Sequence, residues 1–255
     1  MPNSEAIRAA DALARRLYDA GCRYAFGMPG GEVLTLVDAL EAAGIKFILA
    51  KHENAAGFMA EGVHHRTGAP GILVATVGPG ALNGVNAVAN AHQDRVPLIV
   101  LAGAVDQDEV QTYTHQVLDQ QAVFAPITKA SFSLVPGAAH VIADKAVGIA
   151  TEGRPGPVHI DVPISAADAK VPAKAPPYRS PAVPTVPEGD ALDTAREWLS
   201  DSLRPVIIAG VDAMNETAGP ALIEFAETFN VPVITTYKAK GLLPEDHEMA
   251  LGGAG

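Results

Sequence analysis

Short apolar runs alternate with amphipathic stretches along the first 168 residues. Five of the runs have the length of buried strands, and they cover residues 24–26, 46–50, 71–75, 97–101 and 158–162. The stretches between them repeat apolar residues at helical spacing, over residues 4–20, 32–43, 53–66, 80–92 and 137–150. This alternation predicts an α/β domain at residues 1–168, with a parallel sheet that carries helices on both faces.

The pattern stops after that domain and then restarts. Proline recurs through residues 171–187, which removes amide donors and favours an extended backbone, so we expect a semi-rigid linker at residues 169–188. Residues 189–255 then contain two predicted helices and two predicted strands, at 190–200, 219–230, 205–209 and 232–236. We expect Trp198 to lie in the core of this part. Two strands are too few for a sheet buried on both faces, so we expect an incomplete central α/β domain with no closing element at its end.

Composition narrows the classes of function. The 255 residues carry a formal net charge of −11 without a cluster of Lys or Arg, which argues against a nucleic-acid surface. The longest apolar stretch, residues 97–104, is too short to span a bilayer, and the first residues do not resemble a signal peptide. The single cysteine, Cys22, excludes an internal disulfide and fits a reducing compartment. We therefore expect a cytoplasmic protein with Cys22 in its core.

Three motifs follow predicted strands, at the edge where open α/β sheets bind their ligands. They are Gly-Met-Pro-Gly-Gly at residues 27–31, His-Glu-Asn-Ala-Ala at 52–56 and Thr-Val-Gly-Pro-Gly-Ala-Leu-Asn at 76–83. Each motif alone has a plain explanation. The first fits a tight strand-to-helix turn. The second places Glu53 where a helix dipole favours negative charge. The third lacks the lysine of a phosphate-binding P-loop.

Taken together and in this order, the motifs resemble the N-terminal, pyrimidine-binding domain of thiamine-diphosphate-dependent enzymes. The chain is most similar to the group that contains acetohydroxyacid synthases, benzaldehyde lyase and 2-oxo-acid decarboxylases. The resemblance covers nearly the whole chain and continues through residues 91–97, 127–129, 154–163 and 205–210. It implies the thiamine-diphosphate-binding α/β fold for residues 1–168 and part of the family's central domain for residues 189–255.

The resemblance also implies roles for particular residues. In this family a glutamate bonded to N1′ of the aminopyrimidine activates the cofactor, and the position that matches it is Glu53. The pyrimidine would be lined by Pro29, Gly30, Glu53, Thr76, Gly78, Gly80 and Asn83. The family binds diphosphate and Mg²⁺ through a C-terminal Gly-Asp-Gly…Asn motif that these 255 residues do not contain, so no metal ligand is assigned. FAD binding to the central domain stays open.

The loop at residues 103–119 is polar and long enough to carry function. Acetohydroxyacid synthases typically have Phe-Gln-Glu here, whereas this chain has His115-Gln116-Val117. If Gln116 matches the family's glutamine, His115 replaces the phenylalanine and is a candidate for moving protons. A plain surface histidine is the alternative.

By the same resemblance, the protein would be a lyase or transferase that acts on a 2-oxo acid or a related carbonyl donor, by acetolactate-synthase-like decarboxylation or carboligation. It would work as a homodimer or tetramer, with subunits associating through the small-residue faces of helices 53–66 and 80–92. The chain alone would bind cofactor poorly and be inactive. Two alternatives stay open: a catalytically silent binding or regulatory module of this fold, and one chain of a split decarboxylase. The presence of Glu53 counts against a silent module.

Overall fold

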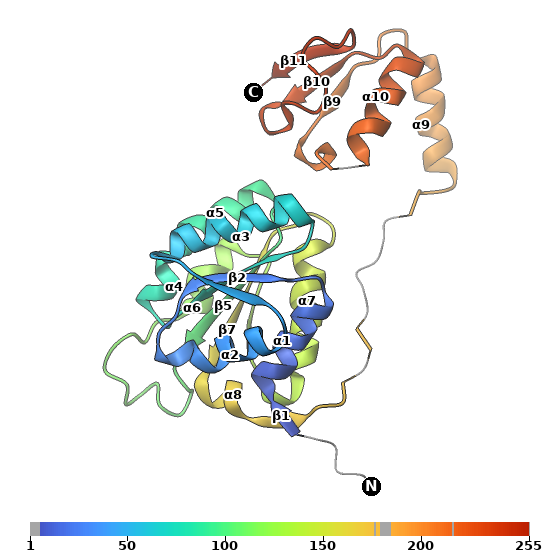
Figure 1. The fold of residues 1–255 in the computed structure, drawn as a ribbon. Helices are drawn as coiled ribbons and strands as arrows, with labels where there is room; N and C mark the ends of the chain where they lie inside the picture. The colour runs from blue at the N-terminus through green and yellow to red at the C-terminus, as the bar shows by residue number, and fades with distance from the viewer. Residues whose placement is uncertain (1–5, 176, 179–184, 216, 255) are drawn as a thin grey trace. The chain divides into compact units, whose positions relative to one another are not determined.

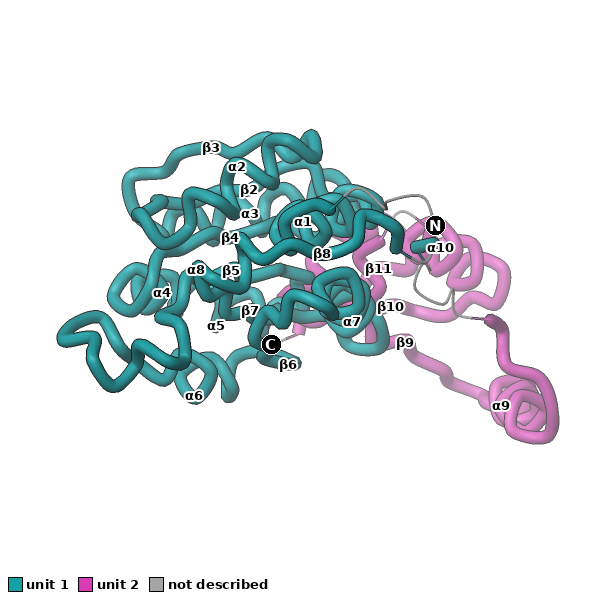
Figure 2. Tube along the Cα trace, turned by 90° about the horizontal axis from the view of Figure 1, so that it is seen from below, with its two compact units in different colours: residues 1–183 teal, residues 184–255 magenta. Residues whose placement is uncertain are grey.

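The chain folds into two compact units. The computed structural model describes residues 6–175, 177–178, 185–215 and 217–254. Unit 1 is Met1–Val183 and unit 2 is Pro184–Gly255, shown in teal and magenta in Figure 2. The division falls within the proline-rich residues 171–187.

Unit 1 is built on a six-stranded, fully parallel sheet in the order β3-β2-β4-β5-β7-β6 (Figure 1). Its strands are β2 (Tyr24–Met28), β3 (Lys46–Leu49), β4 (Gly71–Ala75), β5 (Leu98–Ala104), β6 (Ala130–Ser133) and β7 (Pro157–Pro163). Because all six run in the same direction, their carboxyl ends meet at one edge. The predicted parallel sheet is confirmed, and β6 is added at its margin.

Helices cover both faces of this sheet, as the sequence predicts. The helices of unit 1 are α1 (Ala9–Asp19), α2 (Leu34–Ala42), α3 (Glu53–Thr67), α4 (Pro79–Asn83), α5 (Val85–Asp94), α6 (Gln120–Phe124), α7 (Ala139–Thr151) and α8 (Ile164–Asp168), with 3-10 turns at Gly31–Val33, Ala125–Ile127 and Pro136–Ala138. Ile72 and Val74 of β4 pack with α1, α2, α7 and α8, whereas Leu73 and Ala75 pack with α3, α4, α5 and α6. This is the two-residue alternation of a strand buried on both sides.

Cys22 is fully buried, as expected, in the core that contains Ile72 and Val74. Burial disfavours the charged thiolate and raises the pKa of Cys22 to about 12. The thiol is therefore an inert core group rather than a nucleophile. Within the described residues no helix has both the length and the apolar character that a membrane span requires.

The N-terminal end of unit 1 differs from the prediction. A helix was expected over residues 4–20, but Ala6–Arg8 forms β1, which pairs antiparallel with β8 (Lys170–Pro172); residues 4 and 5 lie outside the described residues. The helix begins after Arg8 because the backbone N–H and the guanidinium of Arg8 both donate to the carboxylate of Asp11, which caps α1. Because β8 lies within the predicted linker at residues 169–188, the first residues of that linker are part of the fold of unit 1. The helix expected at 80–92 is also two helices, α4 and α5, separated by Gly84.

Unit 2 contains a three-stranded parallel sheet in the order β11-β10-β9. Its elements are α9 (Asp190–Asp201), β9 (Ile207–Ala209), α10 (Ala218–Phe229), β10 (Val233–Thr236) and β11 (Ala250–Ala254), with 3-10 turns at Val211–Ala213 and Tyr237–Ala239. The strand β11 corrects the expectation that the last residues form no element. The expectation for Trp198 is also wrong: its side chain is 74% exposed, because none of the residues of α9 is buried.

Candidate active site

Glu53 is a buried carboxylate at the carboxyl edge of the unit 1 sheet. It follows the edge strand β3 and is the first residue of α3, whose N-terminus is capped by the imidazole of His52 accepting from Asn54 N–H at 3.2 Å. Only 4% of Glu53 is exposed. The positive end of the α3 dipole favours a charged carboxylate at this position.

The two oxygens of Glu53 have different surroundings. Asn83, at the end of α4, donates from Nδ2 to Oε2 at 3.0 Å, which fixes the orientation of the carboxylate. Among the described residues, none donates a hydrogen bond to Oε1. Gly80 faces this oxygen, and a Cβ at Gly80 would lie 3.3 Å from Oε1 and 2.5 Å from Thr76 Cγ2. A side chain at Gly80 would therefore displace Thr76 and crowd Oε1.

Thr76 connects this carboxylate to the first glycine-rich motif. Its hydroxyl donates to Glu32 Oε2 at 2.6 Å, and a Cβ at Gly30 would lie 2.5 Å from that hydroxyl oxygen. Gly30, Thr76 and Gly80 are therefore packed in succession up to Glu53. Pro29 precedes Gly30 and is half-buried. The structure thus brings residues from all three sequence motifs to one place, the carboxyl ends of β2, β3 and β4.

Gly78 sits in the same turn with a backbone conformation that favours glycine, at φ 63° and ψ −114°. A Cβ here would lie 2.6 Å from the carbonyl oxygen of Gln116, so the long loop after β5 reaches this turn. Gln116 itself has φ 63° and is half-buried. It lines a cavity of about 760 Å³ whose wall includes Val77, Gln120, Ser131, Ser133 and Asp161.

His115 lies apart from this group of residues. Its side chain is exposed, and its ring stacks on that of Tyr113 with centroids 5.6 Å apart and an interplanar angle of 22°. It does not belong to the lining of the cavity. Of the two loop candidates, the structure therefore brings Gln116, but not His115, to the Thr76–Asn83 motif.

Two residues that the motifs did not identify belong to this region. Glu32 follows the glycine-rich loop directly and holds Thr76, so its position next to the first motif could have suggested it. Gln120 is buried and contacts the Gly78 turn from a helix that the sequence did not predict. No three His, Cys, Asp or Glu side chains come together as a metal-binding group in the described part of the chain.

The chain belongs to the family of thiamine pyrophosphate enzymes. Residues 7–123 match the family's N-terminal TPP binding domain, and residues 192–255 match its central domain. The first match contains the whole Gly30–Thr76–Glu53–Asn83 arrangement, and the second lies in unit 2.

Relatives of this chain carry names from one group of enzymes. It is 37% identical over 98% of its length to a probable acetolactate synthase large subunit of Methanocaldococcus jannaschii, and 34% identical over 98% to the acetolactate synthase isozyme 3 large subunit of Escherichia coli (strain K12). It is 35% identical over its full length to a probable 2-ketoarginine decarboxylase of Pseudomonas aeruginosa. The chain covers 43%, 45% and 46% of these three proteins, so it spans less than half of their length.

Proposed function

We propose that this chain forms the pyrimidine-binding side of the active site of a thiamine-diphosphate enzyme that acts on 2-oxo acids, with Glu53 as the catalytic carboxylate. When bound, thiamine diphosphate supplies the carbon nucleophile and the electron sink for the reaction at the substrate carbonyl. The observation that carries the proposal is the asymmetry of Glu53. Asn83 holds Oε2, and Oε1 has no donor among the described residues.

The role of Glu53 follows from that asymmetry. A carboxylate bonded to N1′ of the aminopyrimidine favours the tautomer in which the exocyclic nitrogen can accept a proton, so Glu53 would hold the N1′ proton. A buried carboxylate with a fixed orientation keeps this bond short and excludes water. Six further residues would line the pyrimidine: Pro29, Gly30, Thr76, Gly78, Gly80 and Asn83. The packing of Gly30 and Gly80 against Thr76 supports this, because a side chain at either glycine would displace Thr76, and one at Gly80 would also crowd Glu53.

For the reaction, we propose a lyase or transferase that decarboxylates a 2-oxo acid or transfers the resulting acyl group. The names of the relatives support this class, since acetolactate synthases and a 2-ketoarginine decarboxylase all act at such carbonyls. Gln116 would contact substrate near the Gly78 turn. His115 would act later, on intermediates, if the loop carries it inward. Mg²⁺ and the diphosphate would be held by sequence outside this chain; FAD binding stays open.

We also propose that the protein is a cytoplasmic homo-oligomer, a dimer or tetramer, without nucleic-acid or membrane partners. The small residues of α3 and α5 pack against each other inside unit 1: a Cβ at Gly57 would lie 2.4 Å from Ala87 Cβ. Gly57 and Ala87 are therefore not free to form an interface, whereas Ala55 of the same predicted face is exposed. Large apolar side chains that stay exposed near the site also support an interface, and Phe58, Met59 and Leu82 among them lie within the predicted ranges 53–66 and 80–92. The other two are Met28 and Leu49.

The role of Glu53 can be tested by comparing two glutamates on the same helix. Glu53 and Glu61 are both buried on α3, and each accepts a hydrogen bond from an asparagine of the facing helices, Asn83 or Asn90. In the intact protein, Glu53→Gln should slow hydrogen–deuterium exchange at C2 of bound thiamine diphosphate by about 10²–10⁴-fold, the scale of general acid–base effects. Glu61→Gln should leave it near the parent rate. Exchange is followed by NMR after acid quench.

Two outcomes would count against the assignment. If both glutamines slow the exchange equally, Glu53 acts through folding rather than chemistry. If neither does, Glu53 is not the activating carboxylate, and a parent protein that itself fails to accelerate C2 exchange would be a silent module of the fold. His115→Ala, measured alongside, should leave C2 exchange unchanged and alter the ratio of decarboxylation to carboligation; slower C2 exchange in that variant would reverse the two roles.

A further inference from the structure

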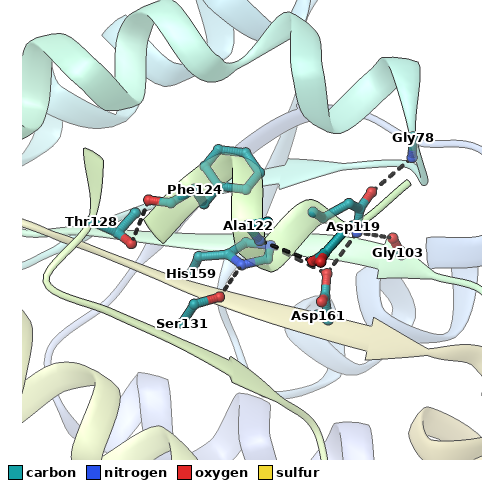
Figure 3. Close-up of polar contacts among 10 residues, drawn as sticks. Gly78, Gly103, Asp119, Ala122, Phe124, Thr128, Ser131, His159 and Asp161 are labelled. Atoms are coloured by element: carbon teal, nitrogen blue, oxygen red, sulfur yellow. Dashed lines mark hydrogen bonds and ion pairs between the residues drawn. The ribbon is translucent and has the colours of Figure 1, made fainter. Parts of the chain in front are cut away.

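Gln120 is a buried amide whose three hydrogen bonds connect three neighbouring strands. It is the first residue of α6 and is 3% exposed. Its Oε1 accepts from the Gly78 N–H at 2.7 Å, in the turn after β4. Its Nε2 donates to the carbonyl oxygen of Gly103 on β5 at 3.0 Å and to Oδ1 of Asp161 on β7 at 2.6 Å. Figure 3 shows Gly78, Gly103 and Asp161 converging on this point.

The orientation of the amide is fixed by its partners. Gly103 and Asp161 offer only acceptor oxygens, so the NH₂ group must face them, and Oε1 must then face the Gly78 N–H. His159 Nε2 lies 3.3 Å from Oδ1 of Asp161 without forming a hydrogen bond to it. The His159 ring is bonded through Nδ1 to Ser131 Oγ at 2.7 Å and stacks on Phe124, with centroids 4.4 Å apart (Figure 3). Asp161, His159 and Phe124 are buried and Ser131 is half-buried, so a largely buried group of side chains lies beneath the Gln120 amide.

The Gly78 turn is the part of the proposed site that this amide controls. Gly78 has φ 63° and ψ −114°, a conformation that glycine can adopt and that would strain a residue with a side chain. Thr76 and Gly80 lie on either side of it, and Asn83 at the end of the following helix holds Glu53. A shift of Gly78 would therefore move the residues that orient the carboxylate.

We infer that Gln120 is a positioning residue: it holds the Gly78 turn in the conformation that presents Thr76, Gly80 and Asn83 to Glu53. The inference rests on the proposed function of Glu53, but the hydrogen bond to Gly78 can be tested without cofactor. Gln120 touches neither reacting atoms nor cofactor in this assignment and acts only through the turn.

Two variants and a matched control separate positioning from general stability. Gln120→Met keeps the length of the side chain and removes all three hydrogen bonds, whereas Gln120→Glu keeps the acceptor and removes the amide donors. Gln121→Met is the control, because Gln121 is the next residue of α6, lines the same cavity and has no side-chain hydrogen bond among the described residues.

The first measurement is amide hydrogen exchange of Gly78 in the intact protein without cofactor. Gln120→Met should speed this exchange by several-fold to about tenfold, since one hydrogen bond is lost to local opening. Gln121→Met should match the parent. An unchanged Gly78 rate in Gln120→Met would overturn the inference whatever the function of the protein.

The second measurement is C2 exchange of thiamine diphosphate at saturating cofactor. Gln120→Met should lower this rate by about 10–100-fold, the scale of a small misplacement of catalytic groups. In Gln120→Glu, the new carboxyl and Asp161 lie at hydrogen-bond distance, so together they bind a proton at low pH and repel each other when both ionise. The rate should therefore approach the parent value at low pH and fall towards that of Gln120→Met as the pH rises.

The Gln120 and Glu53 variants together separate the inference about Gln120 from the proposed function of Glu53. If Glu53→Gln slows C2 exchange but Gln120→Met behaves as Gln121→Met, the positioning role is wrong and the function of Glu53 stands. If C2 exchange in Glu53→Gln is as fast as in the parent, the proposed function is wrong. Hydrogen exchange of the Gly78 amide then still tests the hydrogen bond between Gln120 and Gly78. If Gln120→Met does not fold, Gln120→Glu decides: a rate that falls as pH rises supports the role, and a flat profile overturns it.

Discussion

The two units use the same alternation of strand and helix and reach different degrees of burial. In unit 1, helices cover both faces of six parallel strands, and the inner strands β4 and β7 are buried along their whole length. In unit 2, which has three parallel strands, only six apolar residues are buried among the described residues, and four of them form its core cluster. Large apolar side chains of this unit stay exposed, among them Ile208 at 73% and Leu203 at 96%.

This difference shows that periodicity and burial are separate properties of a sequence. The apolar pattern decides which residues form a strand or a helix. The number of layers that pack together decides whether those elements lose contact with water. Hydrophobic stabilisation scales with the apolar area removed from water, so we expect unit 1 to hold most of the stability of the chain.

The strongest test of this comparison uses two phenylalanines. Phe124 is fully buried in unit 1 against His159, whereas Phe229 in unit 2 is 62% exposed. Phe124→Ala should lower the free energy of unfolding by about 3–5 kcal/mol, because it removes a large buried side chain and leaves a cavity. Phe229→Ala should cost less than about 1 kcal/mol. Urea denaturation followed by far-UV circular dichroism measures both, and similar losses would break the comparison.

A smaller effect is expected from two glycines. A Cβ at Gly27 in β2 would lie 2.0 Å from the carbonyl oxygen of Val74 on the adjacent strand, so Gly27→Ala must push β2 and β4 apart. We expect a loss of about 1–3 kcal/mol, typical of overpacking. Gly210 in unit 2 has no atom within 4 Å of such a Cβ, and its φ is −103°. Gly210→Ala should be neutral within about 0.5 kcal/mol in the same denaturation assay.

The smallest expected difference concerns two ion pairs of equal spacing. Hydrogen bonds from the Arg8 guanidinium lower the pKa of Asp11 below its usual value. A lowered pKa in the folded state means that this pair stabilises unit 1 above the unfolded pKa, near 4, and that the contribution is lost as the pH falls below it. Asp11→Asn should therefore lower stability at neutral pH, by at most about 1 kcal/mol because the pair is partly exposed, and leave it unchanged at low pH.

The pair in unit 2 serves as the control. Asp193 and Arg196 lie 3.1 Å apart on α9, and both side chains are about two-thirds exposed. Solvent screens such a pair, so Asp193→Asn should not change stability at any pH. Acid titration of the thermal midpoint distinguishes the two variants. A larger shift for Asp193→Asn than for Asp11→Asn would contradict the ranking of the units.

The sequence predicted most of the sheet because its strands are short apolar runs next to glycine or polar turns. β4 matches the prediction at both ends, and Gly30, Thr76 and Glu53 were expected at the edge where they lie. What it could not give depends on contacts between distant residues. Ala6–Arg8 forms β1 because it pairs with β8, which lies far away in the sequence, and no local pattern indicates this pairing.

Gln120 and Trp198 illustrate the same limit at the level of side chains. A glutamine in a polar loop gives no sign that it will be buried, because its burial depends on Gly78, Gly103 and Asp161 from three other segments. Trp198 lies on an amphipathic helix and looks like a core residue, but a helix stripe becomes core only where another layer covers it.

The pairing of β1 with β8 gives unit 1 a property beyond stability. The register Ala6↔Pro172 to Arg8↔Lys170 places the point where the polypeptide enters the unit beside the point where it leaves. A unit whose entry and exit adjoin can be joined to new neighbours, or inserted into another protein, without rebuilding its interior. The same ligand-facing edge can therefore be inherited as an interchangeable part, by gene fusion and recombination, in proteins that differ in everything attached to it.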